Sequence, residues 1–312
     1  MTTKTFFQTM ADGTQININR WIPDDEAKGI IVISHGMAEH GLRYDRTASI
    51  FADAGFIVSA HDHRGHGKTA QNQKENGEPG FGYLSDKKGF EKTRDDLYEV
   101  VEQIKKDFPS KKVILLGHSW GSMIAQSFIE KYGNSIDGCI LSGTRGPDNI
   151  GASSGLFLAK LLYLAGQKKR ISNIIDSIAF GGYSKKLPKG SEPYDWLSHN
   201  KMNIEMYKAD QWCGFKMTTE FYHEMFRMLK SIHKKSNMKK IPASLPVLFV
   251  TGTEDPVGVY TKTVKNLCSI YQKNGMSDVN AKYYIDYRHE TLNETNSEIV
   301  HDDIIEWISK HI

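Results

Sequence analysis

Val113-Ile-Leu-Leu-Gly-His-Ser-Trp-Gly-Ser-Met-Ile-Ala-Gln126 is the stretch of sequence that decides the fold. Four apolar residues, typical of a buried strand, run into Gly117-His-Ser-Trp-Gly121, and a segment of helical composition follows. A G-x-S-x-G sequence between a strand and a helix predicts a sharp turn that presents its serine, here Ser119, as a nucleophile. The glycines allow the tight turn, and the start of the following helix favours negative charge that develops beside it.

The sequence on both sides alternates between strand-like and helix-like patterns. Residues 5–10 and 14–21 flank an Asp-Gly turn and predict an antiparallel hairpin. Apolar runs predict further strands at 29–34, 56–60, 112–116, 138–142, 245–251 and 281–285, and helical patterns lie at 88–108, 122–132, 260–274 and 293–310. Such apolar strands are typical of a parallel sheet buried between helices. We therefore predict an α/β fold with a mostly parallel, eight-stranded sheet flanked by helices.

One interval breaks this alternation. About a hundred residues separate the sixth predicted strand from the seventh, whereas ordinary connections of this kind have roughly 2–6. The interval is rich in aromatic residues, Met and Leu, which indicates packed helices rather than a loose linker. We predict a core formed by residues 1–147 and 239–312, with residues 148–238 inserted as a helical cap over the carboxyl edge of the sheet.

A second G-x-S-x-G match lies near the start of this insertion, at Gly151-Ala-Ser-Ser-Gly155. It falls well beyond the nearest predicted strand, in a Gly- and Ser-rich segment. We interpret it as a loop at a helix N-terminus, because strand context rather than the pattern selects the nucleophile.

A nucleophilic serine needs a base and an acid that orients the base, and these follow it at the ends of later strands. The strand predicted at 245–251 ends in Gly-Thr-Glu-Asp-Pro, which places Asp255 at a strand edge. His289 follows the last predicted strand, whereas the two later histidines fall in the terminal helix. We predict Asp255 and His289 as acid and base, with Asp148 and Glu254 as alternative acids.

An oxyanion hole needs two backbone N–H groups. Trp120 directly follows the nucleophile and is predicted to supply one. The turn His35-Gly-Met-Ala-Glu-His40 follows the strand predicted at 29–34, and Met37 is predicted to supply the other. We expect Glu39 and His40 to stiffen this loop by hydrogen bonding.

Composition excludes several classes of function. The 312 residues carry a formal charge of only +3, spread along the chain, so we expect no nucleic-acid partner. The three cysteines, Cys139, Cys213 and Cys268, show no spacing typical of zinc or of a disulfide framework. No segment has the pattern of a signal peptide or a membrane span, so we expect a cytoplasmic protein. The sequence makes no prediction of the oligomeric state.

One histidine-rich segment imitates a metal site. His61-Asp-His-Arg-Gly-His66 places three histidines in six residues, but Gly65 stands where a ligating carboxylate would be needed. We interpret the segment as a turn after a strand, and we predict that the protein requires neither a metal nor a cofactor.

Five motifs resemble one known family along essentially the whole chain. They are H-G-M-A-E-H at 35–40, D-H-R-G-H-G-K-T at 62–69, G-H-S-W-G-S at 117–122, G-T-E-D-P-V-G at 252–258 and H-E-x-L-N-E at 289–294. The chain thereby resembles the monoacylglycerol lipase and lysophospholipase branch of the α/β-hydrolases. The resemblance implies the α/β-hydrolase fold, the triad Ser119, Asp255 and His289, and oxyanion donors at Met37 and Trp120. Members often have Met and Gly where this chain has Trp120 and Ser122, which implies a smaller space beside the nucleophile.

The expected reaction is hydrolysis of a carboxylic ester through an acyl-enzyme intermediate, with a monoacylglycerol or lysophospholipid-type monoacyl lipid as substrate. A general carboxylesterase for short or aromatic acyl esters stays open, as do an iminopeptidase-like amidase and a non-catalytic ligand receptor. Within the cap, Trp212, Phe215 and Met217 are candidate substrate contacts. The apolar stretch 156–164 is expected to pack within the cap, with transient contact to membranes or micelles as the alternative.

Overall fold

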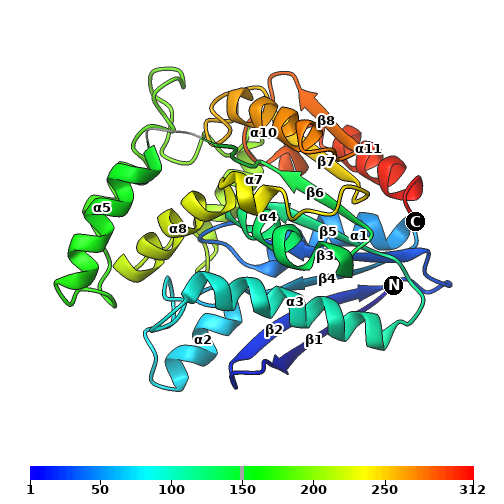
Figure 1. Cartoon of the computed structure of the whole chain (residues 1–312), viewed down its shortest axis with the longest axis horizontal. Coiled ribbons are helices and arrows are strands. Elements are labelled where there is room, and N and C mark those ends of the chain that lie inside the picture. Colours follow the sequence, from blue (N-terminus) through cyan, green and yellow to red (C-terminus); the bar gives the residue numbers. More distant parts are fainter. Residues whose placement is uncertain (148–150) are drawn as a thin grey trace.

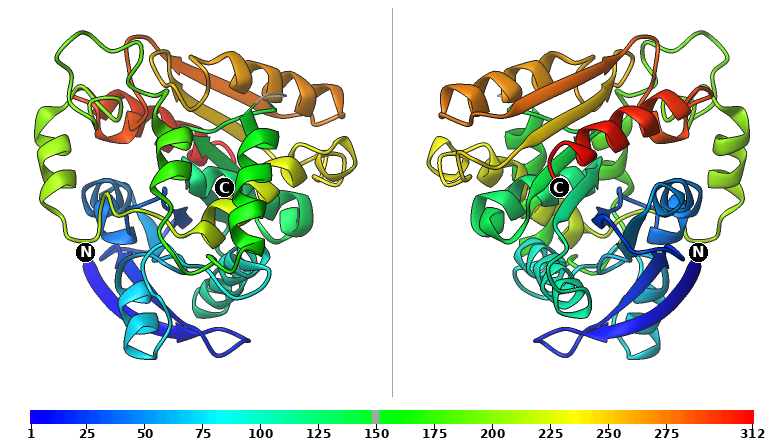
Figure 2. Two further views of the ribbon diagram at one scale, coloured as in Figure 1. Left: turned by 90° about the vertical axis from the view of Figure 1, so that its left-hand side faces the viewer. Right: turned by 90° about the vertical axis from the view of Figure 1, so that its right-hand side faces the viewer.

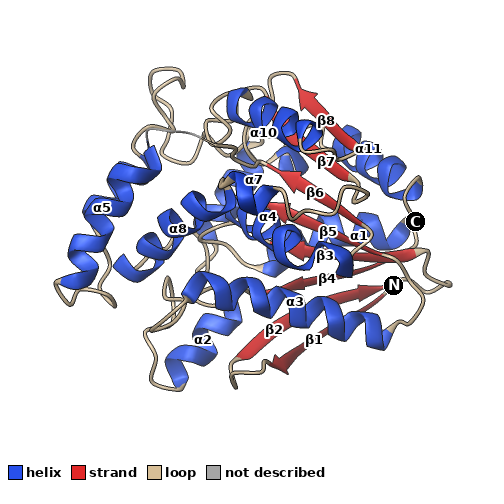
Figure 3. Cartoon of the chain, viewed as in Figure 1, coloured by secondary structure: helices blue, strands red, loops and turns tan. Residues whose placement is uncertain are grey.

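The fold is built on one eight-stranded sheet (Figures 1 and 3). The computed structural model describes residues 1–147 and 151–312, with the backbone alone for 151–155. The strands are β1 (Thr2–Thr9), β2 (Gln15–Ile22), β3 (Gly29–Ser34), β4 (Phe56–His61), β5 (Val113–His118), β6 (Gly138–Ser142), β7 (Val247–Gly252) and β8 (Val279–Tyr284). Their order is β1-β2-β4-β3-β5-β6-β7-β8.

The pairing of the strands confirms the sequence prediction. β1 and β2 form the antiparallel hairpin, and β2 also pairs antiparallel to β4. All other neighbours are parallel. β3 to β7 are buried along their whole length because helices cover both faces, whereas β8 alternates between exposed and half-buried residues for most of its length because it is an edge strand.

Helices cover both faces of the sheet, as the side views show (Figure 2). One face packs against α3 (Gly89–Asp107), α4 (Trp120–Tyr132) and α10 (Lys262–Lys273). The other packs against α1 (Asp45–Asp53) and α11 (Glu298–Ser309). Two apolar clusters result, one on each side of the sheet, and together they hold the strand ends in fixed positions.

Two helices went unpredicted. α1 and α2 (Gly67–Glu75) follow β3 and β4, where polar residues and glycines obscure the helical period. The last strand also begins two residues earlier than predicted, at Val279. None of the helices in residues 1–147 and 151–312 is both long and apolar enough to pass through a lipid bilayer.

The described part of the insertion between β6 and β7 is mainly helical and lies beyond the carboxyl ends of the parallel strands (Figure 1). It contains α5 (Gly151–Leu164), α6 (Asn173–Phe180), α7 (Lys201–Ala209), α8 (Thr219–Ile232) and α9 (Lys235–Met238). Side chains of α8 share one apolar cluster with those of α3 and α4. This helix therefore anchors the insertion to the sheet layer.

Candidate active site

Ser119 occupies the sharp turn between β5 and α4. Its backbone has φ 53° and ψ −121°, a strained conformation for a residue with a side chain. The Ser119 N–H donates to the carbonyl of Ser142 at 2.9 Å, which ties the turn to the end of β6. The residue is half-buried and lines a cavity.

The glycines of this motif are required by close backbone approaches. A Cβ on Gly121 would lie 2.1 Å from the carbonyl oxygen of Ser34, and one on Gly117 would lie 2.7 Å from that of Gly121. Any side chain at either position would push the turn away from β3 or from α4. The pattern therefore fixes the elbow through sterics alone.

His289 and Asp255 meet at the same edge of the sheet. His289 Nδ1 lies 3.0 Å from Asp255 Oδ1, and both residues are almost fully buried. The same carboxylate oxygen accepts the Val257 N–H at 2.8 Å, which fixes its orientation. Burial alone would lower the pKa of His289, but the charge and hydrogen bond of Asp255 outweigh it and raise that pKa above its usual value.

The alternative acids have different surroundings. Glu254 is half exposed and points to His199 and Arg288, at 3.4 and 3.6 Å. Asp148 lies outside the described residues. Of the described carboxylates, Asp255 is the one hydrogen-bonded to His289.

The loop after β3 carries the other predicted oxyanion donor. Glu39 accepts the Gly36 N–H and, at 2.9 Å, the Tyr44 hydroxyl, so the N–H of Gly36 is engaged within the loop. The N–H of Met37 has no acceptor among the described residues, and that of Trp120 begins α4, where helical N–H groups lack partners. Both residues line the cavity. The expectation that Glu39 stiffens this loop agrees with these contacts.

A buried arginine joins this loop to the segment that carries His289. Arg43 Nη1 donates to Glu39 at 2.6 Å and to Glu290 at 2.8 Å, and Nη2 donates to Glu290 at 3.0 Å. The Arg43 side chain is only 8% exposed. From α7, Asn203 also donates to Glu290 at 2.7 Å. Arg43 and Glu290 were not predicted as site residues, because their pairing forms only once the chain is folded.

Two rings pack against the imidazole of His289. The ring of Trp196 lies 5.1 Å away and that of His118 lies 4.8 Å away, centroid to centroid. His118 also lines the cavity. Gly143, at φ 55°, makes room for both histidines: a Cβ there would lie 2.9 Å from His289 Cε1.

The cavity beside Ser119 has a volume of about 850 Å³, within the range of small-molecule sites. Apolar residues of the cap and of α4 line part of it. Phe215 is among them, whereas the other two predicted contacts, Trp212 and Met217, are not. Met217 is 1% exposed within the apolar core, and Trp212 packs edge-on against His40.

The histidine-rich turn after β4 forms a packed cluster rather than an open ligand set. His61 Nε2 lies 3.1 Å from His63 Nδ1, and the ring of His66 stacks on Trp120. Burial lowers the pKa of His61 to about 3 and that of His66 to about 4. These rings stay neutral and support the wall behind the nucleophile.

Comparison with known proteins identifies the family of the chain. Residues 25–296 match the family described as "Serine aminopeptidase, S33". The chain belongs to this family. It is 27% identical over 303 residues to a monoacylglycerol lipase of Mycolicibacterium smegmatis, covering 96% of this chain and 95% of that one. It is also 25% identical over 316 residues to a monoglyceride lipase of Rattus norvegicus, covering 97% and 89%.

Solved structures show the same architecture. A thermostable carboxyl esterase from Bacillus coagulans, in complex with glycerol, superimposes with a TM-score of 0.92 at 27% identity, covering 100% of this chain and 99% of that one. A monoglyceride lipase from Saccharomyces cerevisiae, at 16% identity, shares the fold with a TM-score of 0.77, covering 100% and 96%. The hydrolase is thus an α/β-hydrolase of the monoacylglycerol lipase-like group, and it cleaves esters.

Proposed function

We propose that the hydrolase cleaves monoacylglycerol-type esters with Ser119 as nucleophile, His289 as general base and Asp255 as the orienting acid. The observation that carries this proposal is the hydrogen bond between Asp255 and His289 beside a cavity that Ser119 also lines. Since Nδ1 of His289 faces Asp255, Nε2 is the nitrogen left to take the serine proton.

The proposed reaction has two halves. The Ser119 oxygen attacks the ester carbonyl, His289 takes the serine proton, and the oxyanion accepts the N–H groups of Met37 and Trp120. His289 then donates the proton to the departing alcohol. Water, deprotonated by the same histidine, releases the fatty acid from the acyl-enzyme. Each step uses groups of this chain and needs no further cofactor.

The cavity favours a monoacyl substrate over a short ester. Its walls include Met123, Phe180, Phe226 and Leu229, which suit an acyl chain, and its polar side includes Glu39. Its volume accommodates one long chain with a small head group. The full-length similarity to monoacylglycerol lipases supports the same substrate class.

Substitution of Ser119 tests the nucleophile. Ser119→Ala is expected to abolish hydrolysis of p-nitrophenyl esters and labelling by a fluorophosphonate probe. The matched control is Ser153→Ala, in the second G-x-S-x-G sequence, which should keep both. Labelling that persists in Ser119→Ala and disappears in Ser153→Ala would overturn the assignment.

A substrate panel tests the specificity. We expect the highest kcat/KM for long-chain monoacylglycerols, compared with lysophosphatidylcholine, short-chain p-nitrophenyl esters and a proline naphthylamide. A maximum for short-chain esters would instead indicate a general carboxylesterase. A maximum for the amide would indicate an iminopeptidase-like activity.

Apolar side chains on the outer surface of the cap support transient contact with a lipid surface. Phe157, Leu161 and Leu164 of α5 are exposed, as is Ile174 of α6. Burying such side chains at a bilayer interface would bring the cavity close to its lipid substrate.

Sedimentation with phospholipid vesicles tests this contact. Leu164→Asp should reduce the bound fraction, whereas Ile285→Asp, at an equally exposed position after β8, should leave it unchanged. Equal binding by both variants would exclude the cap as the contact surface.

Cys139, Cys213 and Cys268 are all free thiols, which supports a reducing compartment such as the cytoplasm.

A further inference from the structure

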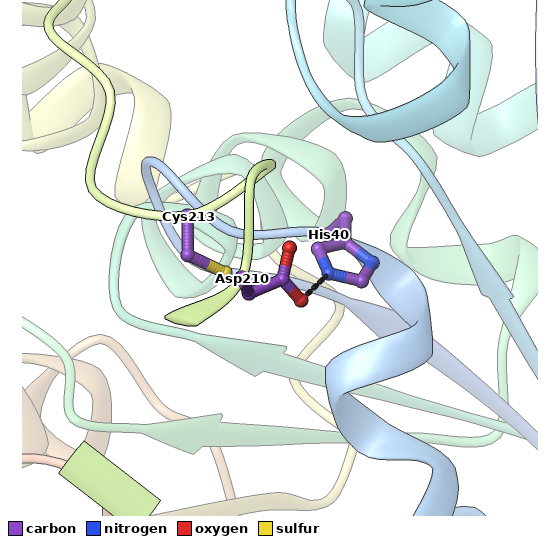
Figure 4. A group of neighbouring side chains, drawn as sticks. All are labelled: His40, Asp210 and Cys213. Carbon is purple, nitrogen blue, oxygen red and sulfur yellow. Dashed lines mark hydrogen bonds and ion pairs between the residues drawn. The ribbon is translucent and has the colours of Figure 1, made fainter. Parts of the chain in front are cut away.

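His40, Asp210 and Cys213 converge where the loop after β3 meets the turn after α7 (Figure 4). Their donor atoms all lie within 4.8 Å of one another, and no other group of three such donors occurs in residues 1–147 and 151–312. His40 Nε2 already lies 2.8 Å from Asp210 Oδ2. We propose that these three side chains bind one divalent transition-metal ion of the Zn²⁺ type.

The donor set selects a class of metal. A thiolate and an imidazole are soft or borderline ligands that favour Zn²⁺ and Co²⁺, whereas Mg²⁺ and Ca²⁺ require several oxygens. Three protein ligands leave one position of a tetrahedral ion for water. Ligand bonds to such an ion measure roughly 2.0–2.3 Å, and the three donor atoms lie within 4.8 Å of one another around the place that the ion would occupy.

The ligands are held in place before any ion binds. Asp210 Oδ1 accepts the N–H of Trp212 at 2.8 Å, which leaves Oδ2 directed at His40. The Trp212 ring packs edge-on against the imidazole of His40, 5.3 Å away. The other imidazole nitrogen, Nδ1, is buried without a hydrogen-bond partner among the described residues. When Nε2 binds an ion, the proton of the neutral imidazole resides on Nδ1.

Charge also fits a divalent cation. A thiolate from Cys213 and a carboxylate from Asp210 would neutralise the ion, and the nearby Arg43 is already paired with Glu39 and Glu290. Metal binding would form a sulfur–metal bond and release the thiol proton to solvent, with no change in oxidation state.

The position of the site gives it a structural consequence. Next to it, the Gly214 N–H donates to the carbonyl of Ala38 at 2.9 Å, directly beside Met37. An ion held by His40 on one side and by Asp210 and Cys213 on the other would clamp the cap to the loop that carries the proposed oxyanion donor. This site is separate from the ester chemistry, which does not require it.

Cobalt titration of chelator-treated protein tests the proposal. We expect one equivalent of Co²⁺ to bind, with a thiolate-to-cobalt charge-transfer band and the visible bands of a four-coordinate ion. Cys213→Ser should lose the charge-transfer band, and Asp210→Asn should weaken Zn²⁺ binding at least about tenfold in equilibrium dialysis. The matched control is Cys268→Ser, a partly buried thiol on α10, which should behave as wild type.

The readout is spectroscopic, so its result is independent of ester hydrolysis. Absence of the charge-transfer band from the wild-type protein would overturn the proposal whatever the variants do. So would a band that survives in Cys213→Ser and disappears in Cys268→Ser. Thermal melting without metal verifies that each variant is folded, and only the wild-type protein and Cys268→Ser should gain the full increase in melting temperature on addition of Zn²⁺.

Discussion

Arg43 and Glu290 form a two-point ion pair, although 247 residues separate them in the chain: Nη1 lies 2.8 Å from Oε1, and Nη2 lies 3.0 Å from Oε2. Glu290 directly follows His289, and Arg43 also holds Glu39, which accepts the N–H of Gly36. Burial opposes ionisation of Glu290, but Arg43 outweighs it and holds the pKa of Glu290 well below its usual range. One guanidinium thus connects the loop of the proposed general base to the proposed oxyanion loop.

Arg43→Lys should lower kcat by a factor of about 10 to 10², because a single ammonium cannot reproduce the planar fork and small displacements at a reacting centre are costly. KM should change little, since Arg43 acts by positioning its neighbours. Steady-state kinetics on a monoacylglycerol measures both constants. Arg46→Lys, on an exposed arginine of α1, is the matched control. An unchanged kcat in Arg43→Lys would show that the bridge has no positioning role.

Asp255→Asn should lower kcat by roughly 10⁴, because an amide cannot hold the imidazole in the required tautomer. The neighbouring Glu254→Gln should stay near wild type, since that carboxylate faces His199 and Arg288. Paired kinetics of the two variants decides between these adjacent acids. Loss of activity in Glu254→Gln alone would reverse the assignment.

The pH dependence follows from the raised pKa of His289. The base must be neutral to act, so kcat/KM should fall as the pH drops through this pKa, at a pH above the usual value for histidine. Glu290→Gln removes a negative neighbour that raises this pKa. The acidic limb of the profile of kcat/KM against pH should therefore move to lower pH. Glu298→Gln, an exposed residue of α11, should leave the limb in place. The position of the limb, rather than the maximal rate, is the quantity to compare.

Trp120→Met should favour longer acyl chains. The indole lines the cavity beside the nucleophile and packs on His66 and Phe221, at 5.3 and 4.9 Å between centroids. A smaller side chain leaves space for additional methylenes and should shift the ratio of long-chain to short-chain kcat/KM by roughly tenfold. The backbone N–H is kept, so the proposed oxyanion contact survives. A ratio that stays constant would place the acyl chain elsewhere in the cavity.

Gly143→Ala should impair catalysis through the position of His289. The new methyl group would lie 2.9 Å from His289 Cε1 and 3.1 Å from His118 Cε1, and the backbone has φ 55°. A reduced kcat, together with a lower melting temperature, is expected. Gly13→Ala, also at positive φ but with open space around it, separates backbone strain from the steric clash. It should lower stability and leave kcat unchanged.

The sequence predicted the sheet well because its signals are local. An Asp-Gly turn located the hairpin of β1 and β2, and apolar runs located the other strands. The strand–turn–helix context selected Ser119 over Ser153. α1 and α2 were missed because they begin in polar, glycine-containing segments where tertiary packing rather than periodicity sustains the helix.

The candidate contacts in the cap show where local signals end. Trp212, Phe215 and Met217 lie within six residues, yet only Phe215 lines the cavity, because the turn directs one side chain inward, one to the core and one against His40. Composition identified the segment as apolar and packed. It carried no information on side-chain direction.

By itself, the amino-acid sequence determined the strand order along the chain, the elbow at Ser119 and the strand ends at which Asp255 and His289 stand. Only the tertiary structure decided the pairing of Arg43 with Glu290, the contact of His118 with His289 and the meeting of His40 with Cys213. The physical reason is the separation of the residues along the chain. Backbone conformation and the apolar pattern of a strand are local, whereas these contacts depend on how a sheet and its insertion pack across more than a hundred residues of chain.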